Sequence, residues 1–337
     1  MRALNDRAVA CDGGYILCWL QQALRGHDNP VIDAAVRLGN APHRPVLVYH
    51  GVREDYPYAS DRLHRFILGA SRDLGRGCRE RGLACVQHVD RDGAREKGLV
   101  HRLGAAAAAI VVEDQPTFVA RWQAERVAAR AAVAVFAVNA ACLVSPAVIG
   151  SGIGSRTGFL RRHEPARADW LESDTGTCDV AAYTGPPPFV PDRLDNHSDA
   201  DLDALVAGLA IDHSLPANTE YPAGRAAQAR LDRLVRKVLP VYAAVRNDAT
   251  LAIGASGLSP YLHFGVTGPR EVMAAVHSAA AGARHKAKFA DELLGWRERF
   301  LYQATELADP KRYSRIAGWA VDTLASHAGD PVRASSR

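Results

Sequence analysis

Two segments in the last third of the sequence combine residue types that can do chemistry. The first, Ala255 to Gly265, reads Ala-Ser-Gly-Leu-Ser-Pro-Tyr-Leu-His-Phe-Gly, and its turn consists of Ser256, Gly257, Leu258 and Ser259. Such a turn presents hydroxyls and backbone N–H groups where a helix begins, and its glycine lets the main chain approach a ligand closely. We therefore predict a diphosphate-binding turn at residues 256–259. The alternative is an ordinary capped helix start.

The second segment is a helical pattern of mixed character. Its side chains are three or four residues apart, which predicts one shared face of one helix; they are Phe289, Glu292, Trp296 and Arg299. A core face would not carry an unpaired carboxylate, and a solvated face has little use for large aromatic side chains. A mixed face suits a cavity wall, because an indole can stack on a base and a partly desolvated carboxyl can hydrogen-bond to it. We predict that Glu292 and Trp296 line such a pocket.

Basic residues accompany both segments. Lys286 and Lys288 come just before Glu292, a position that favours contact with nucleic-acid phosphates. A second basic cluster consists of Arg156, Arg161, Arg162 and His163. Such a cluster is as typical of a solvated surface patch as of a contact with nucleic-acid phosphates.

The first 150 residues alternate between short apolar runs and helical patterns. The runs are brief, β-branched or aromatic, and bounded by breakers, which predicts buried strands at residues 15–20, 46–49, 84–86, 109–112 and 133–138. Helices are predicted to begin at Asn29 and Pro30, at Ser60, near Lys97 and at Thr117. This alternation predicts a parallel sheet with helices on both faces, whose ligands bind beyond the carboxyl ends of the strands.

The predicted fold class is α/β plus all-α, with three parts. Residues 1–150 form a doubly wound, Rossmann-like domain. Residues 151–199 are dense in Gly and Pro and are predicted to be a linker across the surface. Residues 200–337 form an all-α domain, because helical patterns cover 200–211, 226–245, 269–281 and 286–308 with no strand pattern between them.

Composition sets further bounds. The 337 residues, 48% hydrophobic and 23% charged, describe an ordinary protein with room for two domains, and the net charge of +4 permits nucleic-acid binding without showing it. The six cysteines form no Cys-x-x-Cys pair, so we expect free, partly buried thiols and no metal site. No signal-peptide core and no run approaching 18 apolar residues occurs, which predicts a cytoplasmic protein without a membrane span.

Several motifs in register resemble the class II cyclobutane pyrimidine dimer photolyases of the photolyase/cryptochrome superfamily. They are Ser256 to Gly265, the upstream Arg246-Asn247-Asp248 and the downstream Asp291-Glu292-Leu-Leu-Gly-Trp296-Arg297-Glu298. In the N-terminal half, Tyr15 to Gln22 resembles that family's first strand and turn, and Asp55 to Phe66 resembles its second-strand exit and next helix. Together these blocks cover most of the chain in the expected order.

The resemblance implies light-driven repair of cyclobutane pyrimidine dimers by electron transfer from reduced FAD, with UV-damaged DNA as partner. It implies that Glu292 and Trp296 are catalytic. It implies FAD contacts at Tyr242, Arg246, Asn247, Ser256, Gly257, Leu258, Ser259 and Leu262, and DNA contacts at Arg156, Lys286, Lys288 and Arg297. The alternative for Arg246 and Asn247 is a helix C-cap. The sequence identifies no antenna chromophore, and a monomer is expected.

The sequence departs from the family pattern near its C-terminus. Photolyases of this class continue into further helices beyond Ala317 to Asp330, so the helical FAD-binding domain is expected to be truncated, with weak or no flavin retention. Arg299 and Gln303 also replace residues usual in the family. The alternatives are a catalytically impaired remnant that binds DNA, a cryptochrome-like flavoprotein, and a nucleotide-activating enzyme on a similar sheet. For the last, the sequence contains neither His-x-Gly-His nor Ser-Gly-Gly-x-Asp-Ser.

Overall fold

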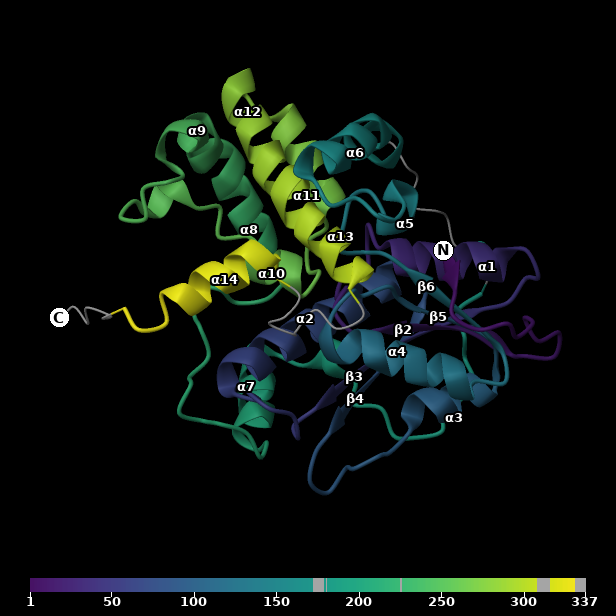
Figure 1. Ribbon diagram of the computed structural model, residues 1–337. Coiled ribbons are helices and arrows are strands. Elements are labelled where there is room, and N and C mark those ends of the chain that lie inside the picture. Colours follow the sequence, from purple (N-terminus) through teal and green to yellow (C-terminus); the bar gives the residue numbers. More distant parts are fainter. Residues whose placement is uncertain (172–178, 180, 225, 308–315, 331–337) are drawn as a thin grey trace.

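The computed structural model describes the chain except for residues 172–178, 180, 225, 308–315 and 331–337. Its N-terminal part is a sheet with strand order β1-β6-β5-β2-β3-β4 (Figure 1). The five predicted strands are confirmed and run parallel: β2 (Tyr15–Leu20), β3 (Val46–Arg53), β4 (Ala84–Asp90), β5 (Ala107–Glu113) and β6 (Ala134–Val138). The short β1 (Arg2–Ala3) adds an antiparallel edge beside β6.

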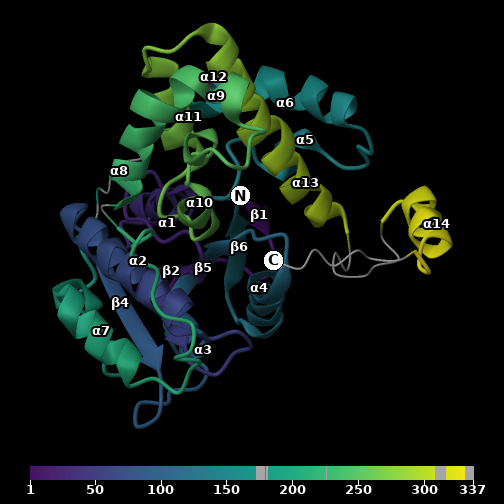
Figure 2. The same cartoon turned by 90° about the vertical axis from the view of Figure 1, so that its left-hand side faces the viewer.

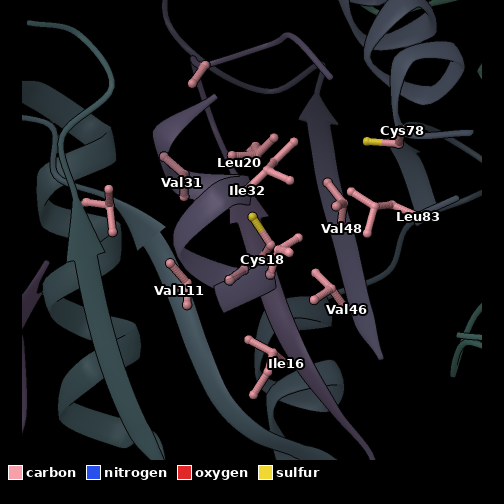
Figure 3. Close-up of a cluster of buried hydrophobic side chains, with 14 of the residues drawn as sticks. Ile16, Cys18, Leu20, Val31, Ile32, Val46, Val48, Cys78, Leu83 and Val111 are labelled. Carbon is pink, nitrogen blue, oxygen red and sulfur yellow. The ribbon is translucent and has the colours of Figure 1, made fainter. Parts of the chain in front are cut away.

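Helices cover both faces of this sheet, as the α/β prediction requires. On one face α1 (Pro30–Asn40) and α2 (Asp61–Glu80) pack against it, and on the other α3 (Leu99–Ala105) and α4 (Phe118–Arg130) do so. Every side chain of β2 is buried, because a central parallel strand has no solvent face. Figure 3 shows Ile16, Cys18 and Leu20 of β2 packed with Val31 and Ile32 of α1.

The predicted helix starts are confirmed, but side-chain capping occurs at one of them. Asn29 Oδ1 accepts from the N–H of Val31 at 3.1 Å, and Pro30 opens α1. Ser60 and Thr117 stand at the N-cap positions of α2 and α4 without a side-chain cap bond. The starts of α2 and α4 therefore depend on packing rather than on capping.

The predicted linker at residues 151–199 contains a helix, so this prediction is wrong for part of its span. After the short α5 (Pro146–Ile149), α6 (Arg156–Leu171) buries Phe159 and His163. Phe159 belongs to the same apolar core as the later helices. The rest of the span, where described, contains the 3-10 helix η1 (Leu194–Asn196). Helical packing thus begins earlier in the chain than predicted.

Helix α7 (Asp199–Ala207) packs against α2 and joins a core cluster that includes Val52 of β3 and Val89 of β4. A capping box joins Ser198 and Asp201 at its start. Leu202 and Val206 of α7 share a core cluster with Leu68 of α2. Helix α7 therefore shares a core with the first part of the chain, and the predicted domain border at residue 200 stays a prediction.

The remaining described residues are helical and contain no further strand. They form α8 (Ala226–Arg233), π-helix η2 (Leu234–Val238), η3 (Leu239–Val241), α9 (Tyr242–Val245), η4 (Ala252–Gly254), α10 (Ser259–His263), α11 (Pro269–Ser278), α12 (Ala283–Ala290), π-helix η5 (Asp291–Arg297), α13 (Glu298–Glu306) and α14 (Gly318–Ser326). All but η4 and α14 contribute residues to one core, and α14 lies apart from the other helices (Figure 2). The predictions about the tail after Asp330 lie outside the described residues.

Three further observations concern the described part of the chain. No helix in that part is long and apolar enough to cross a membrane. No group of three or more His, Cys, Asp or Glu side chains there could hold a metal ion. The described cysteines are free thiols, and Cys18, Cys78 and Cys142 are buried; Cys178 lies outside the described residues.

Candidate functional site

The predicted phosphate turn directly precedes α10, and its glycine is required by the backbone. Gly257 has a φ of +72°, a conformation that side-chain-bearing residues rarely adopt. A Cβ added there would lie 3.3 Å from Cε1 of Tyr221 and 3.5 Å from Nη1 of Arg230. The main chain of the turn therefore lies against an aromatic ring and a guanidinium, and a guanidinium is a suitable neighbour for a phosphate.

The side chains of the turn point to different surroundings. Ser256 Oγ accepts from the N–H of Leu258 at 3.3 Å, and Ser259 is exposed. Leu258 is 1% exposed and belongs to the helical core, with Leu262 packed beside that core. Leu258 can therefore reach a cofactor through its main chain, while the two serines can use their hydroxyls.

Arg230 of α8 is a site residue that sequence reasoning missed. Its guanidinium lies 4.2 Å from the ring centroid of Tyr221 and beside Gly257. Glu220 forms an ion pair with it at 3.7 Å. Arg230 is one of several arginines in the helical pattern at 226–245, and spacing alone does not distinguish it from the others.

Arg246 connects the region of the turn to the predicted catalytic carboxylate. Its Nη1 lies 2.8 Å from Oε1 of Glu292. A Cβ on Gly254, two residues before Ser256, would lie 3.6 Å from the Arg246 Cα. Arg246 is also the C-cap residue of α9, so the alternative role given by the sequence is compatible with this contact.

Tyr242 and Asn247, also predicted to bind FAD, flank Arg246. Tyr242 packs edge-on against Phe289 with ring centroids 5.2 Å apart. Burial, and then the charge of Glu292, raise the pKa of the Tyr242 hydroxyl, so this hydroxyl is a hydrogen-bond donor at neutral pH. Asn247 is exposed just beyond α9.

Glu292 is half-buried and lies between two cations. Besides Arg246, Nζ of Lys288 lies 2.8 Å from Oε1 of Glu292. Hydrogen bonds to Glu292 and Asp291 raise the pKa of Lys288. The carboxylate is thus fixed in orientation, and its acceptor sites outnumber these two partners.

Trp296 presents its indole at a partly exposed position, 37% accessible. The Arg156 guanidinium lies 4.7 Å from its ring centroid, and Phe300 stacks at 6.2 Å. Asp291 forms an ion pair with Arg156. The indole is therefore partly accessible, and the Arg156 guanidinium lies over its ring.

The helix that carries these residues is not uniform. Asp291–Arg297 is a π-helix, η5, and such segments occur frequently at functional sites. Phe289 is 5% exposed and packs against Tyr242, so it belongs to the core and not to an open pocket wall. Glu292 contacts the end of α9 and Trp296 contacts the start of α6, which lie on either side of α12 in Figure 1. Their action as a pair stays a prediction.

All four cations predicted to contact DNA make contacts within the chain. Lys286 Nζ donates to the carbonyl of His277 at 2.7 Å. Arg297 Nη1 donates to the carbonyl of Ala141 at 2.7 Å. Arg156 and Lys288 have the acidic partners named above. Arg297 therefore also joins the helices to the segment that follows β6.

A buried polar network beside this site was also missed. Glu298, 1% exposed, accepts from the N–H of Leu143 at 2.6 Å and pairs with His163 Nε2 at 2.8 Å. Arg167 Nε donates to His163 Nδ1 at 2.9 Å. His163 therefore does not belong to a solvated basic patch, and its position in a charged run concealed its burial.

Two cavities open elsewhere, on either side of residues 24–28. One of about 470 Å³ is lined by α1, Trp170 and Arg270, and one of about 450 Å³ by α2 and Gly224. Neither is lined by residues predicted to bind FAD. The flavin site is therefore argued from the turn and its neighbours.

Comparison with known proteins gives consistent results. Residues 16–173 match the family model for DNA photolyase. A deoxyribodipyrimidine photo-lyase of Methanothermobacter thermautotrophicus is 25% identical over 335 residues, which are 98% of this chain and 70% of the relative.

Solved structures share the fold at low sequence identity. A class III photolyase of Agrobacterium tumefaciens has a TM-score of 0.60 and 17% identity, with 90% of this chain and 61% of the other covered. A cryptochrome of Synechocystis has a TM-score of 0.62 and 14% identity, with 87% and 61% covered. The chain thus spans about three fifths of the length of these structures. The chain is thus similar to a DNA photolyase model over residues 16–173 and to an archaeal photo-lyase over most of its length, and it shares its fold with the two solved structures.

Proposed function

We propose that this protein is a DNA photolyase that repairs cyclobutane pyrimidine dimers in a light-driven reaction with reduced FAD, and that it belongs to class II. The observation that carries the proposal is the turn at Gly257. It combines a left-handed glycine with an adjacent arginine, Arg230, in the helical part of a chain whose first half matches the DNA photolyase model. A diphosphate requires this combination of close main-chain approach and positive charge.

The residues present fit the diphosphate of FAD. The main chain at 256–259 and the Ser256 and Ser259 hydroxyls would hold the phosphates, and Arg230 would neutralise part of their charge. When bound, reduced FAD supplies the electron that splits the dimer. Arg246 pairs with Glu292 and Tyr242 packs against Phe289, so both residues would border the cofactor.

Glu292 and Trp296 would act on the damaged bases. The indole offers a flat surface for a base taken out of the duplex, and such stacking contributes about 1–3 kcal/mol per base. Glu292 would accept a hydrogen bond from a base while Arg246 and Lys288 keep its carboxylate in place. Arg156 and the Lys286–Lys288 segment would contact the DNA phosphates.

Two measurements test the proposal. Because flavin retention is expected to be weak, the protein is first reconstituted with FAD; its visible spectrum should then show a flavin band, and illumination should clear dimers from an irradiated oligonucleotide. Trp296→Ala should lower repair at least tenfold. Trp122→Ala is the matched control, because Trp122 is 53% exposed on α4 and also stacks with an arginine, Arg126, at 3.8 Å.

The outcomes separate the alternatives. A flavin band without repair would favour a cryptochrome-like flavoprotein or a catalytically impaired DNA-binding remnant. Absence of flavin after reconstitution with FAD would refute the cofactor assignment. Equal losses of repair in the Trp296 and Trp122 variants would refute the proposed position of the lesion.

A further inference from the structure

A buried carboxylate occupies the point in the sheet where anionic ligands usually bind. Glu113 ends β5 and is 1% exposed. Its Oε1 accepts from three consecutive backbone N–H groups after β2: Gln21 at 2.7 Å, Gln22 at 2.9 Å and Ala23 at 2.8 Å. Consecutive N–H groups that converge on one point form an anion-binding nest.

This nest lies where doubly wound sheets usually bind their ligands. The chain order of the sheet changes direction between β2 and β5, and Glu113 and Gln21 stand at the carboxyl ends of these two strands. Doubly wound folds bind the anionic part of their ligands in this crevice. Here the carboxylate belongs to the chain itself.

The loop held by Glu113, residues 21–28, supports the helical part of the molecule. Arg25 Nη1 donates to the carbonyl of Gly265 at 2.8 Å, and the N–H of Leu24 donates to that of Phe264 at 3.1 Å. A Cβ on Gly265 would lie 2.6 Å from the Cα of Ala23, so the two backbones are in direct contact. Arg270 at the start of α11 forms an ion pair with Asp28.

We propose that Glu113 is a built-in anion that fills the ligand position of the sheet and uses it to fix loop 21–28 under α10 and the turn at Gly257. Glu113 is a positioning residue in this proposal. Truncation of its side chain creates a site for a small carboxylate such as formate. The proposal does not depend on the proposed repair function, because stability and amide exchange test it.

Another residue also holds this loop, so the test must isolate the anion. Asn29 Nδ2 donates to the carbonyls of Ala23 and Arg25 at 2.9 and 2.8 Å. Those bonds fix the carbonyl side of the loop, whereas Glu113 binds its N–H side. An exogenous anion can replace the bonds of Glu113 but not those of Asn29.

The experiment compares the full-length Glu113→Ala and Glu113→Gln variants with the unaltered protein. Glu113→Ala is expected to lower Tm by about 5–10 °C, because three buried N–H groups lose their acceptor. Sodium formate should raise the Tm of Glu113→Ala in a saturable way, while sodium chloride at equal ionic strength should not. Glu113→Gln retains an acceptor oxygen without charge, and it is expected to lose less stability than Glu113→Ala.

Amide hydrogen exchange supplies the readout for docking. In both variants, exchange should accelerate in residues 20–28 and in residues 262–268 but not in β4, and formate should reverse this in Glu113→Ala. If Glu113→Ala does not fold, Glu113→Gln gives the exchange test by itself. The matched control is Glu125→Ala, since Glu125 pairs with Arg121 on the exposed face of α4. Equal effects of formate on variant and unaltered protein, or faster exchange confined to residues 20–28, would overturn the proposal.

Discussion

Removal of the Glu298 carboxylate should destabilise the protein more than removal of any exposed carboxylate on α13. Glu298 accepts from the N–H of Leu143 at 2.6 Å, from that of Val144 at 3.4 Å, and pairs with His163 at 2.8 Å. Glu298→Ala leaves these donors buried without an acceptor. Each unsatisfied donor costs about 1–3 kcal/mol, and the bond at 3.4 Å is weak. Two full losses therefore predict about 2–6 kcal/mol.

Urea denaturation of the purified variants measures this difference. The control is Glu306→Ala, on the same helix, which removes one acceptor from the exposed N–H of Gly152 and should cost less than about 1 kcal/mol. The double variant His163→Ala with Glu298→Ala should be less destabilised than the sum of the single variants, because the two side chains are partners. Equal losses for Glu298→Ala and Glu306→Ala would refute the reasoning.

The remaining predictions concern the turn and the response to pH. Gly257→Ala should cost about 1–2 kcal/mol and lower flavin retention, because φ of +72° strains a residue with a Cβ; flavin absorbance per protein and urea denaturation measure this, with Gly318→Ala as control since nothing lies near its Cβ position. Burial lowers the pKa of His50 to about 4 from 6.5. Because this folded pKa lies below the unfolded value, His50 contributes stability that is complete above pH 6.5 and is lost as pH falls toward 4, by about 3 kcal/mol. His50→Gln should remove this dependence of the free energy of unfolding on pH. Burial raises the pKa of Asp33 to about 6, which has the opposite effect on stability, but Asp33 is present in both proteins and cancels in the difference between them. Parallel plots of unfolding free energy against pH for the two proteins would contradict the assignment to His50.

The sequence was sufficient for the sheet because its strands are short, apolar and bounded by breakers. It was insufficient for α6 because this helix has Pro165 in its interior and a charged sequence without a clear apolar stripe. It was also insufficient for the placement of α7, since a helical pattern does not say which core the helix joins. The spacing of residues along the chain predicts secondary structure, whereas tertiary structure determines which core a helix packs into.

The same distinction applies to the site. Gly257 could be identified from the sequence because a glycine between serines just before a helix predicts a tight turn, and its positive φ agrees with such a turn. Arg230, Glu298 and His163 were missed because their significance arises from partners ten to more than a hundred residues away. A uniform helical period also does not predict the π-helix at Asp291–Arg297.

At the carboxyl edge of the sheet, the N–H groups that follow β2 and β6 are bound by carboxylates of the chain itself. Glu113 holds the N–H groups that follow β2, and Glu298 of the helical part holds those that follow β6. Arg297 binds the carbonyl of Ala141 on the same segment. These N–H groups are already bonded within the chain, so they are not available to a nucleotide, whereas the cavity of about 470 Å³ lies beside them and is lined by Val138 and Leu143. Ligand binding at this edge therefore stays a prediction. In the helical part, the turn at Gly257 has the left-handed glycine and the neighbouring guanidinium that a diphosphate needs.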